Sequence, residues 1–187
     1  DLQVNGGFGV EVDANSDSLR LIARKLPESG VTSYLPTVIS SFAEQYAGFF
    51  AAFDAASDAT GARALGFHLE GPYLAPARKG APPIAAIEQA IDELFERFLD
   101  YSGTSLVTIA GERPGTIARI SRLRERGIVV SLGHTNATVD ELIAGVDAGA
   151  VMATHLYNAM SPFGHREPGV IGAVLTEDRL VAGLIAD

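Results

Sequence analysis

The chain has 187 residues, 47% of them hydrophobic and 20% charged, which is enough for one buried core and typical of a globular domain. Its 23 acidic residues outnumber the 14 basic ones, and the formal net charge of −9 argues against a nucleic-acid partner or a basic membrane patch. Cysteine is absent, which excludes disulfides and leaves histidine and carboxylates as the available metal ligands.

In chain order, short apolar segments alternate with segments of helical spacing. Strands are predicted from residue 1 and over residues 31–37, 64–70, 106–110, 127–134, 151–155 and 180–185, and helices over residues 16–29, 42–56, 84–101, 115–126 and 138–148. Ser16 or Asp17 is expected to cap the first helix, and Gly30 to end it. Thr138 and Glu141 form a capping box for the last helix.

This alternation of about seven strands with helices indicates an α/β protein with a parallel sheet. Each short apolar strand is followed by a polar loop, which favours the (β/α)₈ TIM barrel over an open doubly wound sheet. The glycine-rich dinucleotide-binding fingerprint is missing after the first strand. A complete barrel takes about 250 residues. We therefore expect residues 1–187 to form a single, incomplete barrel domain that is a piece of a longer protein.

Three of the predicted strands end in side chains that can bind a metal ion. Glu70, His134 and His155 follow apolar strands, and parallel strands place their carboxyl ends on one face of a barrel. Two imidazoles and a carboxylate leave a coordination position open, which is typical of a catalytic zinc site. The same residues could instead form a hydrogen-bonded network without metal, and their spacing alone leaves both interpretations open.

Two other histidines have simpler interpretations. His68 lies on the same side of its strand as Glu70, so it either supports the metal site or is a hydrogen-bonded interior residue. His165 lies in a loop beside Arg166, and we expect it to be solvated.

An ordered set of motifs extends from the first residue to the last and resembles the N-acetylglucosamine-6-phosphate deacetylases of the amidohydrolase superfamily. No single motif is decisive, but the ordered set is specific. The motifs are Asp1-Leu-Gln-Val-Asn-Gly6, His68-Leu-Glu-Gly-Pro72, Lys79-Gly-Ala81, Gly133-His-Thr-Asn-Ala137, Ala153-Thr-His-Leu-Tyr-Asn-Ala-Met160, Arg166-Glu-Pro-Gly169 and Gly183-Leu-Ile-Ala-Asp187.

The resemblance implies that Glu70, His134 and His155 bind one divalent metal ion, zinc or a similar one. Many amidohydrolases carry a His-x-His pair on the first strand for a second metal. Here Gln3 and Asn5 occupy those positions, as in the single-metal deacetylases, so a two-metal site is not expected.

The resemblance also implies a substrate site for a small amino-sugar phosphate. Asn158, Ala159 and Arg166 would contact the sugar phosphate, with Arg166 supplied by the partner subunit of a homodimer. Asp187 corresponds to a position that lines the sugar site. Ala81 and its neighbour Pro82 belong to the loop that contacts the phosphate.

The chain departs from the family at Pro82 and beyond Asp187. The family usually has histidine, a phosphate donor, where this chain has Pro82, so we expect one phosphate contact to be lost. The catalytic aspartate that transfers the proton is expected on an eighth strand beyond Asp187, followed by a histidine that polarises the carbonyl. An amino-terminal β-sandwich is also expected outside this chain. The chain by itself is therefore expected to hold the metal ligands but no catalytic acid or base, and to be inactive.

The predicted function is the metal-dependent hydrolysis of N-acetylglucosamine 6-phosphate to glucosamine 6-phosphate and acetate, in amino-sugar catabolism. The alternatives are a deacetylase for another N-acetyl amino sugar, which Pro82 leaves open, and a non-catalytic module that binds a metal or a sugar phosphate. No apolar run reaches the roughly 20 residues of a membrane span, and no signal-peptide pattern opens the chain, so we expect a cytoplasmic protein.

Overall fold

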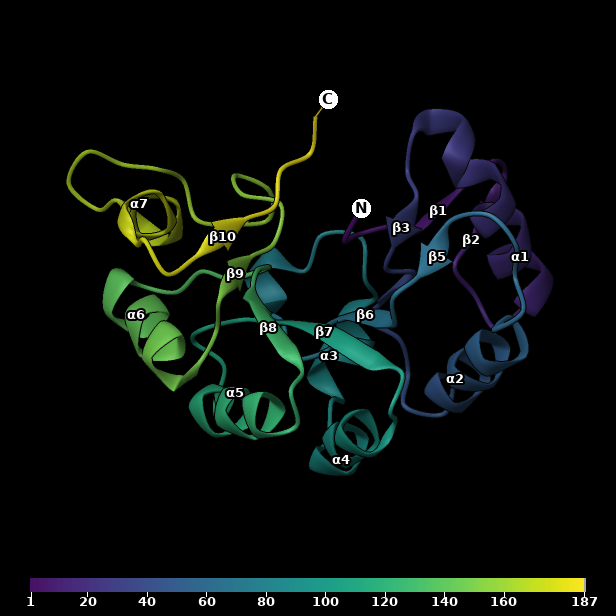
Figure 1. Ribbon diagram of the computed structural model, residues 1–187. Coiled ribbons are helices and arrows are strands. Elements are labelled where there is room, and N and C mark those ends of the chain that lie inside the picture. Colours follow the sequence, from purple (N-terminus) through teal and green to yellow (C-terminus); the bar gives the residue numbers. More distant parts are fainter. Residues whose placement is uncertain (187) are drawn as a thin grey trace.

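The computed structural model describes residues 1–186, and a six-stranded parallel sheet lies at its centre (Figure 1). Its strands, in spatial order, are β4 (Thr37–Ile39), β6 (Phe67–Glu70), β7 (Thr104–Ile109), β8 (Val129–Leu132), β9 (Met152–Ala153) and β10 (Val181–Ala182). This spatial order follows the sequence, without the reversal that defines a doubly wound sheet. A parallel bridge between Val4 and Pro36 places the amino-terminal segment beside β4.

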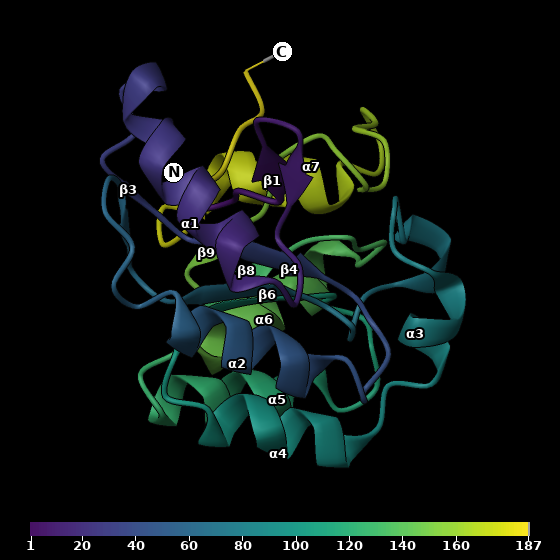
Figure 2. The same cartoon turned by 90° about the vertical axis from the view of Figure 1, so that its right-hand side faces the viewer.

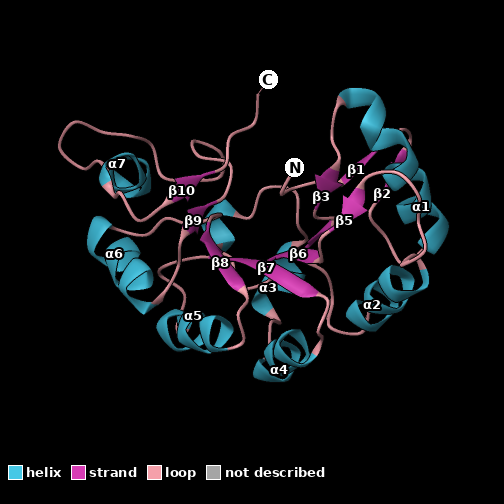
Figure 3. Ribbon diagram, viewed as in Figure 1, coloured by secondary structure: helices cyan, strands magenta, loops and turns pink. Residues whose placement is uncertain are grey.

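Helices cover the convex side of the curved sheet, and the concave side opens toward both ends of the chain (Figures 1 and 3). The helices are α1 (Ser16–Lys25), α2 (Tyr46–Ala55), α3 (Ile84–Glu88), α4 (Asp92–Asp100), α5 (Thr116–Glu125), α6 (Val139–Ala148) and α7 (Gly169–Thr176), with 3-10 turns η1 (Leu26–Ser29) and η2 (Pro76–Arg78). Turned by 90°, α2, α4, α5 and α6 lie together beneath the strands (Figure 2). Two short pairs accompany the sheet, antiparallel β1 (Gly6–Gly7) with β2 (Val10–Glu11) and parallel β3 (Ser33–Tyr34) with β5 (Arg63–Ala64).

The strand period of two separates the core from the side chains that can do chemistry. On β6, Phe67 and Leu69 are fully buried in the hydrophobic core under the helices. The intervening His68 and Glu70 line cavities on the concave side. On the convex side the core is rich in aromatic rings, among them Phe98 of α4. The polar residues of the strands therefore share one hollow face.

Most of the predicted elements are present, but the structure differs from the prediction at three places. The prediction of one helix over residues 84–101 is wrong, because α3 and α4 are separated at Ile91. The backbone of Ile91 is extended, and its carbonyl accepts a 2.8 Å hydrogen bond from Tyr73 Oη. The cap of α1 is Asn15, one residue before Ser16. Helix α7 was not predicted, because its apolar sequence with two glycines lacks the polar face that marks an amphipathic helix.

Two local predictions are confirmed. Thr138 and Glu141 form the capping box of α6. Gly30, with φ of 81°, ends the first helical segment in the left-handed conformation that glycine favours.

The α/β class with a parallel sheet is confirmed, whereas the closed barrel stays a prediction. Over residues 1–186 the sheet is open, with β10 at one edge and β4 at the other, beside the bridge between Val4 and Pro36. Separately, none of the helices in this described part has the length and apolar character needed to cross a membrane.

Candidate metal centre

Three donor atoms from distant parts of the chain converge at the carboxyl ends of the strands. Glu70 is the last residue of β6, and His134 and His155 each follow the end of a strand by two residues. Glu70 Oε1 lies 3.0 Å from His134 Nε2 and 3.1 Å from His155 Nε2, and the two Nε2 atoms are 3.0 Å apart. All three side chains are buried. The structure thus brings together the three residues predicted as metal ligands.

The backbone turns sharply where it presents these imidazoles. Four of the five non-glycine residues with positive φ in the described chain lie here: His134 (48°), His155 (31°), Tyr157 (77°) and Ala159 (51°). Backbone conformations of this kind cost free energy and cluster at functional sites.

Close packing beside the donors also requires a glycine. A Cβ on Gly133 would lie 2.8 Å from Thr154 Cβ, so no larger residue fits before His134. The approach of these strand ends is therefore specified by the sequence.

A backbone hydrogen bond fixes the tautomer of His134. Its Nδ1 donates to the carbonyl oxygen of Arg78 at 2.9 Å, so in the neutral ring Nε2 carries a lone pair that faces Glu70 Oε1. Two lone pairs 3.0 Å apart repel each other unless a proton or a cation lies between them. Metal-bound histidines typically have this arrangement, with the second ring nitrogen donating to a carbonyl or carboxylate.

The pKa values of Glu70 and His134 reflect this mutual dependence. Burial alone would raise the pKa of Glu70, but the hydrogen bonds from His134 and His155, together with charge on His134, outweigh burial and hold it far below its usual range. Burial lowers the pKa of His134, and the hydrogen bond and charge of Glu70 outweigh that effect and leave it raised. Glu70 is therefore an anion that needs positive charge beside it.

The geometry of the three donors fits a divalent cation. Zinc binds nitrogen and oxygen at about 2.0–2.2 Å in tetrahedral sites, which separates two ligands by roughly 3.3–3.5 Å. The separations here are 3.0–3.1 Å, so a small adjustment would admit an ion. Among the described residues, Glu70, His134 and His155 are the group of histidine and carboxylate side chains whose ligand atoms lie close enough together to hold a metal ion.

The cavity that the three donors line also contains four other residues named in the sequence analysis. It has a volume of about 580 Å³ and is lined in part by Gln3, Asn5, Ala81 and Pro82 together with the three donors. Gln3 Nε2 donates to Glu70 Oε1 at 2.8 Å, so Gln3 stabilises the carboxylate directly.

The remaining predicted substrate residues are placed differently. Asn158 and Ala159 follow His155, and the Ala159 carbonyl accepts a 3.1 Å hydrogen bond from the backbone N–H of Thr135, next to His134. Arg166 lies instead in a separate hollow of about 540 Å³ beside the start of α6. Asp187 lies outside the described residues.

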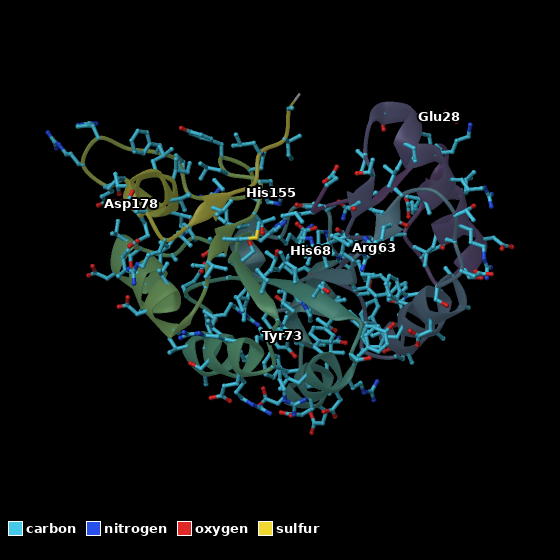
Figure 4. All side chains as sticks on the ribbon, viewed as in Figure 1. Glu28, Arg63, His68, Tyr73, His155 and Asp178 are labelled. Atoms are coloured by element: carbon cyan, nitrogen blue, oxygen red, sulfur yellow. The ribbon has the colours of Figure 1, made fainter. Side chains whose placement is uncertain are left out.

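The two other histidines are now assigned. His68 is a hydrogen-bonded interior residue, 2% exposed, and burial lowers its pKa to about 4, so the ring is neutral at physiological pH. Figure 4 shows His68 and His155 on the concave side of the sheet, and Tyr73 between the sheet and the helices. His165 is exposed, as expected.

Glu112 supports the His134 turn, and the sequence analysis missed it. One carboxylate oxygen accepts a hydrogen bond from Thr135 Oγ1, and the other accepts a 2.6 Å bond from the backbone N–H of Asn136. Its position in the sequence could have indicated this role, because Glu112 follows β7 closely, as Glu70 ends β6. Because parallel strands place their carboxyl ends together, a carboxylate after β7 is expected near the same site.

The fold and the three donors define a β/α protein with a candidate metal centre at the carboxyl ends of its strands. No protein-family model matches the chain. The chain is 40% identical over 198 residues to the N-acetylglucosamine-6-phosphate deacetylase of Bacillus subtilis (strain 168), covering 100% of this chain and 49% of the relative. The human enzyme of the same name is 38% identical, with 98% of this chain and 47% of the relative covered.

Solved structures give the same result. The crystal structure of N-acetylglucosamine-6-phosphate deacetylase from Pasteurella multocida matches with a TM-score of 0.90 and 39% identity, covering 100% of this chain and 50% of the other. A Mycobacterium smegmatis deacetylase variant in complex with N-acetyl-D-glucosamine-6-phosphate matches with a TM-score of 0.87 and 31% identity, covering 98% and 49%. The resemblance to the N-acetylglucosamine-6-phosphate deacetylases is confirmed, and the chain spans about half the length of the relatives it matches.

Removing the Glu112 carboxylate is expected to loosen the turn that carries His134. Glu112→Ala deletes two hydrogen bonds to a charged acceptor, each of which contributes about 1.5–3 kcal/mol when protected from water. Because Glu112 is only partly buried, we expect a loss of about 2 kcal/mol in the free energy of unfolding, measured by chemical denaturation. Glu125→Ala, at an exposed position of α5, is the matched control, and equal losses in the two variants would contradict the assignment.

Proposed function

We propose that this chain supplies the metal-binding part of a deacetylase that hydrolyses N-acetylglucosamine 6-phosphate to glucosamine 6-phosphate and acetate. The observation that carries the proposal is the convergence of Glu70, His134 and His155 within 3.1 Å, in a fold that matches such a deacetylase with a TM-score of 0.90. A chance hydrogen-bonded cluster would not need two buried imidazoles to face each other through Nε2.

The proposed cofactor is one divalent ion, and the two-histidine, one-carboxylate donor set favours Zn²⁺. When bound, such an ion supplies Lewis-acid polarisation of the acetyl carbonyl and a water of lowered pKa. The protein's own part is orientation and charge. The Arg78 carbonyl holds the His134 tautomer, and Gln3 holds the Glu70 carboxylate. With three protein ligands, a coordination position remains for water or substrate.

The proposed substrate site is the 580 Å³ cavity that holds the three donors, a volume within the range of small-molecule sites. Ala81 and Pro82 line this cavity, and we propose that Asn158 and Ala159 contact the sugar phosphate from its edge. Arg166 lies in a separate hollow, which supports a role in the partner's site of a homodimer.

We further propose that the rest of the protein completes a cytoplasmic enzyme with an eight-stranded barrel. The relatives are about twice as long as this chain, which leaves room for an eighth strand and an amino-terminal β-sandwich. The proton-transferring aspartate belongs on that strand, beyond Asp187. Residues 1–187 would then be one partial barrel domain, inactive by itself.

A second candidate substrate is N-acetylgalactosamine 6-phosphate. A relative from Shewanella sp. (strain ANA-3) named N-acetylgalactosamine-6-phosphate deacetylase is 36% identical over 100% of this chain and 48% of its own length. This identity is close to that of the glucosamine relatives, so the substrate must be decided by experiment.

The first experiment measures acetate release by the intact protein from several amino sugars. We expect N-acetylglucosamine 6-phosphate to give a higher kcat/KM than N-acetylgalactosamine 6-phosphate or unphosphorylated N-acetylglucosamine. A preference for the galactosamine substrate would assign the second candidate function. Binding of a sugar phosphate without acetate release would support a non-catalytic module and contradict hydrolysis.

The second experiment measures the metal content of the intact protein. We expect about one divalent ion per chain. Mutating a residue that hydrogen-bonds a metal ligand lowers metal affinity roughly 10–100-fold. His155→Ala removes a ligand itself, so it should lower metal affinity by more than this. The exposed His165→Ala variant is the control and should keep its metal. Equal metal content in the two variants would refute the proposed ligand set.

The third experiment concerns phosphate recognition at Pro82. An imidazole in its place would add an N–H donor within the substrate cavity, so Pro82→His is expected to lower the KM for the phosphorylated sugar about tenfold, or about 1.4 kcal/mol. The KM for an unphosphorylated substrate should not change. Pro83→His, at the exposed neighbouring position, is the control, and an unchanged KM in Pro82→His would rule out this role.

A further inference from the structure

A row of hydrogen-bonded side chains crosses the concave side of the sheet beneath the metal centre. Ser131 Oγ lies 2.6 Å from Thr154 Oγ1, which lies 2.8 Å from Thr108 Oγ1. Thr108 Oγ1 lies 2.7 Å from His68 Nε2, and His68 Nδ1 lies 3.0 Å from the carbonyl oxygen of Leu2. The four side chains are at most 5% exposed. The row therefore links β8, β9, β7 and β6 to the amino-terminal segment.

The last member of the row determines the direction of every hydrogen bond in it. A carbonyl oxygen can only accept, so the Leu2 carbonyl requires the proton of the neutral His68 ring to be on Nδ1. His68 Nε2 must then accept from the Thr108 hydroxyl, which in turn accepts from Thr154. Ser131 donates to Thr154 in the same sense. A buried row in which each hydroxyl has a defined role is rigid.

The row is directly connected to the proposed metal ligands. His68 precedes Glu70 by two residues on β6, so both side chains lie on the same face, and Thr154 directly precedes His155. At the other end, Leu2 is adjacent to Gln3, whose Nε2 donates to Glu70 Oε1 at 2.8 Å. Strand β6 therefore holds the amino-terminal segment at two points, through His68 to Leu2 and through Glu70 to Gln3.

The hydrogen bond from His68 acts on the peptide group that directly precedes Gln3. Backbone hydrogen bonds to Leu35 hold the segment at Asp1 and at Val4, on either side of this peptide. Between those two points, the Leu2 carbonyl accepts a hydrogen bond from the buried His68 Nδ1, and the N–H of the same peptide group donates to the exposed Asp1 carboxylate at 3.0 Å. The Gln3 side chain is not fully buried, so packing alone does not immobilise it. The orientation of the Leu2 carbonyl therefore sets the direction in which Gln3 leaves the backbone.

We propose that His68 is a positioning residue for the metal centre, which it serves by holding the Leu2–Gln3 segment so that Gln3 orients the Glu70 carboxylate. This inference rests on the proposed metal-dependent function. It assigns His68 a role distinct from binding the ion, because both of its ring nitrogens already have partners within the protein.

The test compares two amide replacements of His68 in the intact protein, with Co²⁺ as the probe. In His68→Asn the new amide nitrogen can take the place of Nδ1 and keep the bond to the Leu2 carbonyl. In His68→Gln the longer side chain extends its amide toward Thr108 and loses that bond. We expect His68→Asn to bind Co²⁺ within about threefold of the unaltered protein. We expect His68→Gln to bind it about 10–100-fold more weakly, the usual cost of losing support for a ligand.

A double-mutant cycle with Gln3→Ala tests whether His68 acts through Gln3. If it does, His68→Gln combined with Gln3→Ala should lose no more Co²⁺ affinity than Gln3→Ala alone. Fully additive losses, or unchanged affinity in His68→Gln, would overturn the inference. The visible absorption of bound Co²⁺, which reports ligand geometry, should change in His68→Gln and Gln3→Ala alike and remain unaltered in His68→Asn.

Two further outcomes are decisive. If His68→Gln does not fold, His68→Leu, which also loses the bond to the Leu2 carbonyl, takes its place, and a loss of tenfold or more in His68→Asn would overturn the inference. If the unaltered protein binds no Co²⁺, both the metal function and this inference fail. If it binds Co²⁺ and His155→Ala does not, the metal function stands whatever the His68 variants show.

Discussion

The buried carboxylate of Glu70 is the constraint on which the concave side of the protein depends. Among the described residues, it is the one carboxylate that is buried, and no lysine or arginine of this part is buried. An isolated charge in such a place is unfavourable, so it must be paired or bound to a metal. Gln3, His134 and His155 all approach the same oxygen, Glu70 Oε1. Side chains from the amino-terminal segment and from the residues that follow β8 and β9 therefore converge on one atom at the end of β6.

The division of the sheet into two faces keeps this arrangement stable. Phe67 and Leu69 alternate with His68 and Glu70, so each strand contributes to a hydrophobic core on one side and to polar chemistry on the other. The core under the helices can then compensate for the positive φ at the turns that carry the imidazoles. The row from Ser131 through His68 to the Leu2 carbonyl lies on the polar side and satisfies its own hydrogen bonds, so it adds no unpaired group beneath the charge.

The sequence predicted what depends on strand periodicity and did not predict what depends on tertiary placement. Glu70, His134 and His155 were identified because parallel strands must present their carboxyl ends together. The break at Ile91 was missed because it is tied to Tyr73, 18 residues away, and the helical spacing continues through it. Arg166 was grouped with the substrate residues by motif, yet its loop lines another hollow, because sequence periodicity does not specify where a loop lies in the fold.

The charge of the proposed metal centre would allow an acidic protein to bind the proposed anionic sugar phosphate. The formal net charge is −9, but exposed charges are screened beyond about 8 Å at physiological ionic strength. Near the cavity the relevant sum is that of the proposed divalent ion and the Glu70 carboxylate, which leaves one positive charge, while His68 and the hydroxyl row are neutral. At an effective dielectric constant of about 20, a unit charge near a protein surface attracts an anion about four times as strongly as it does in water. The local charge therefore outweighs the surface balance, and orientation of Glu70 by Gln3 determines how that charge is presented.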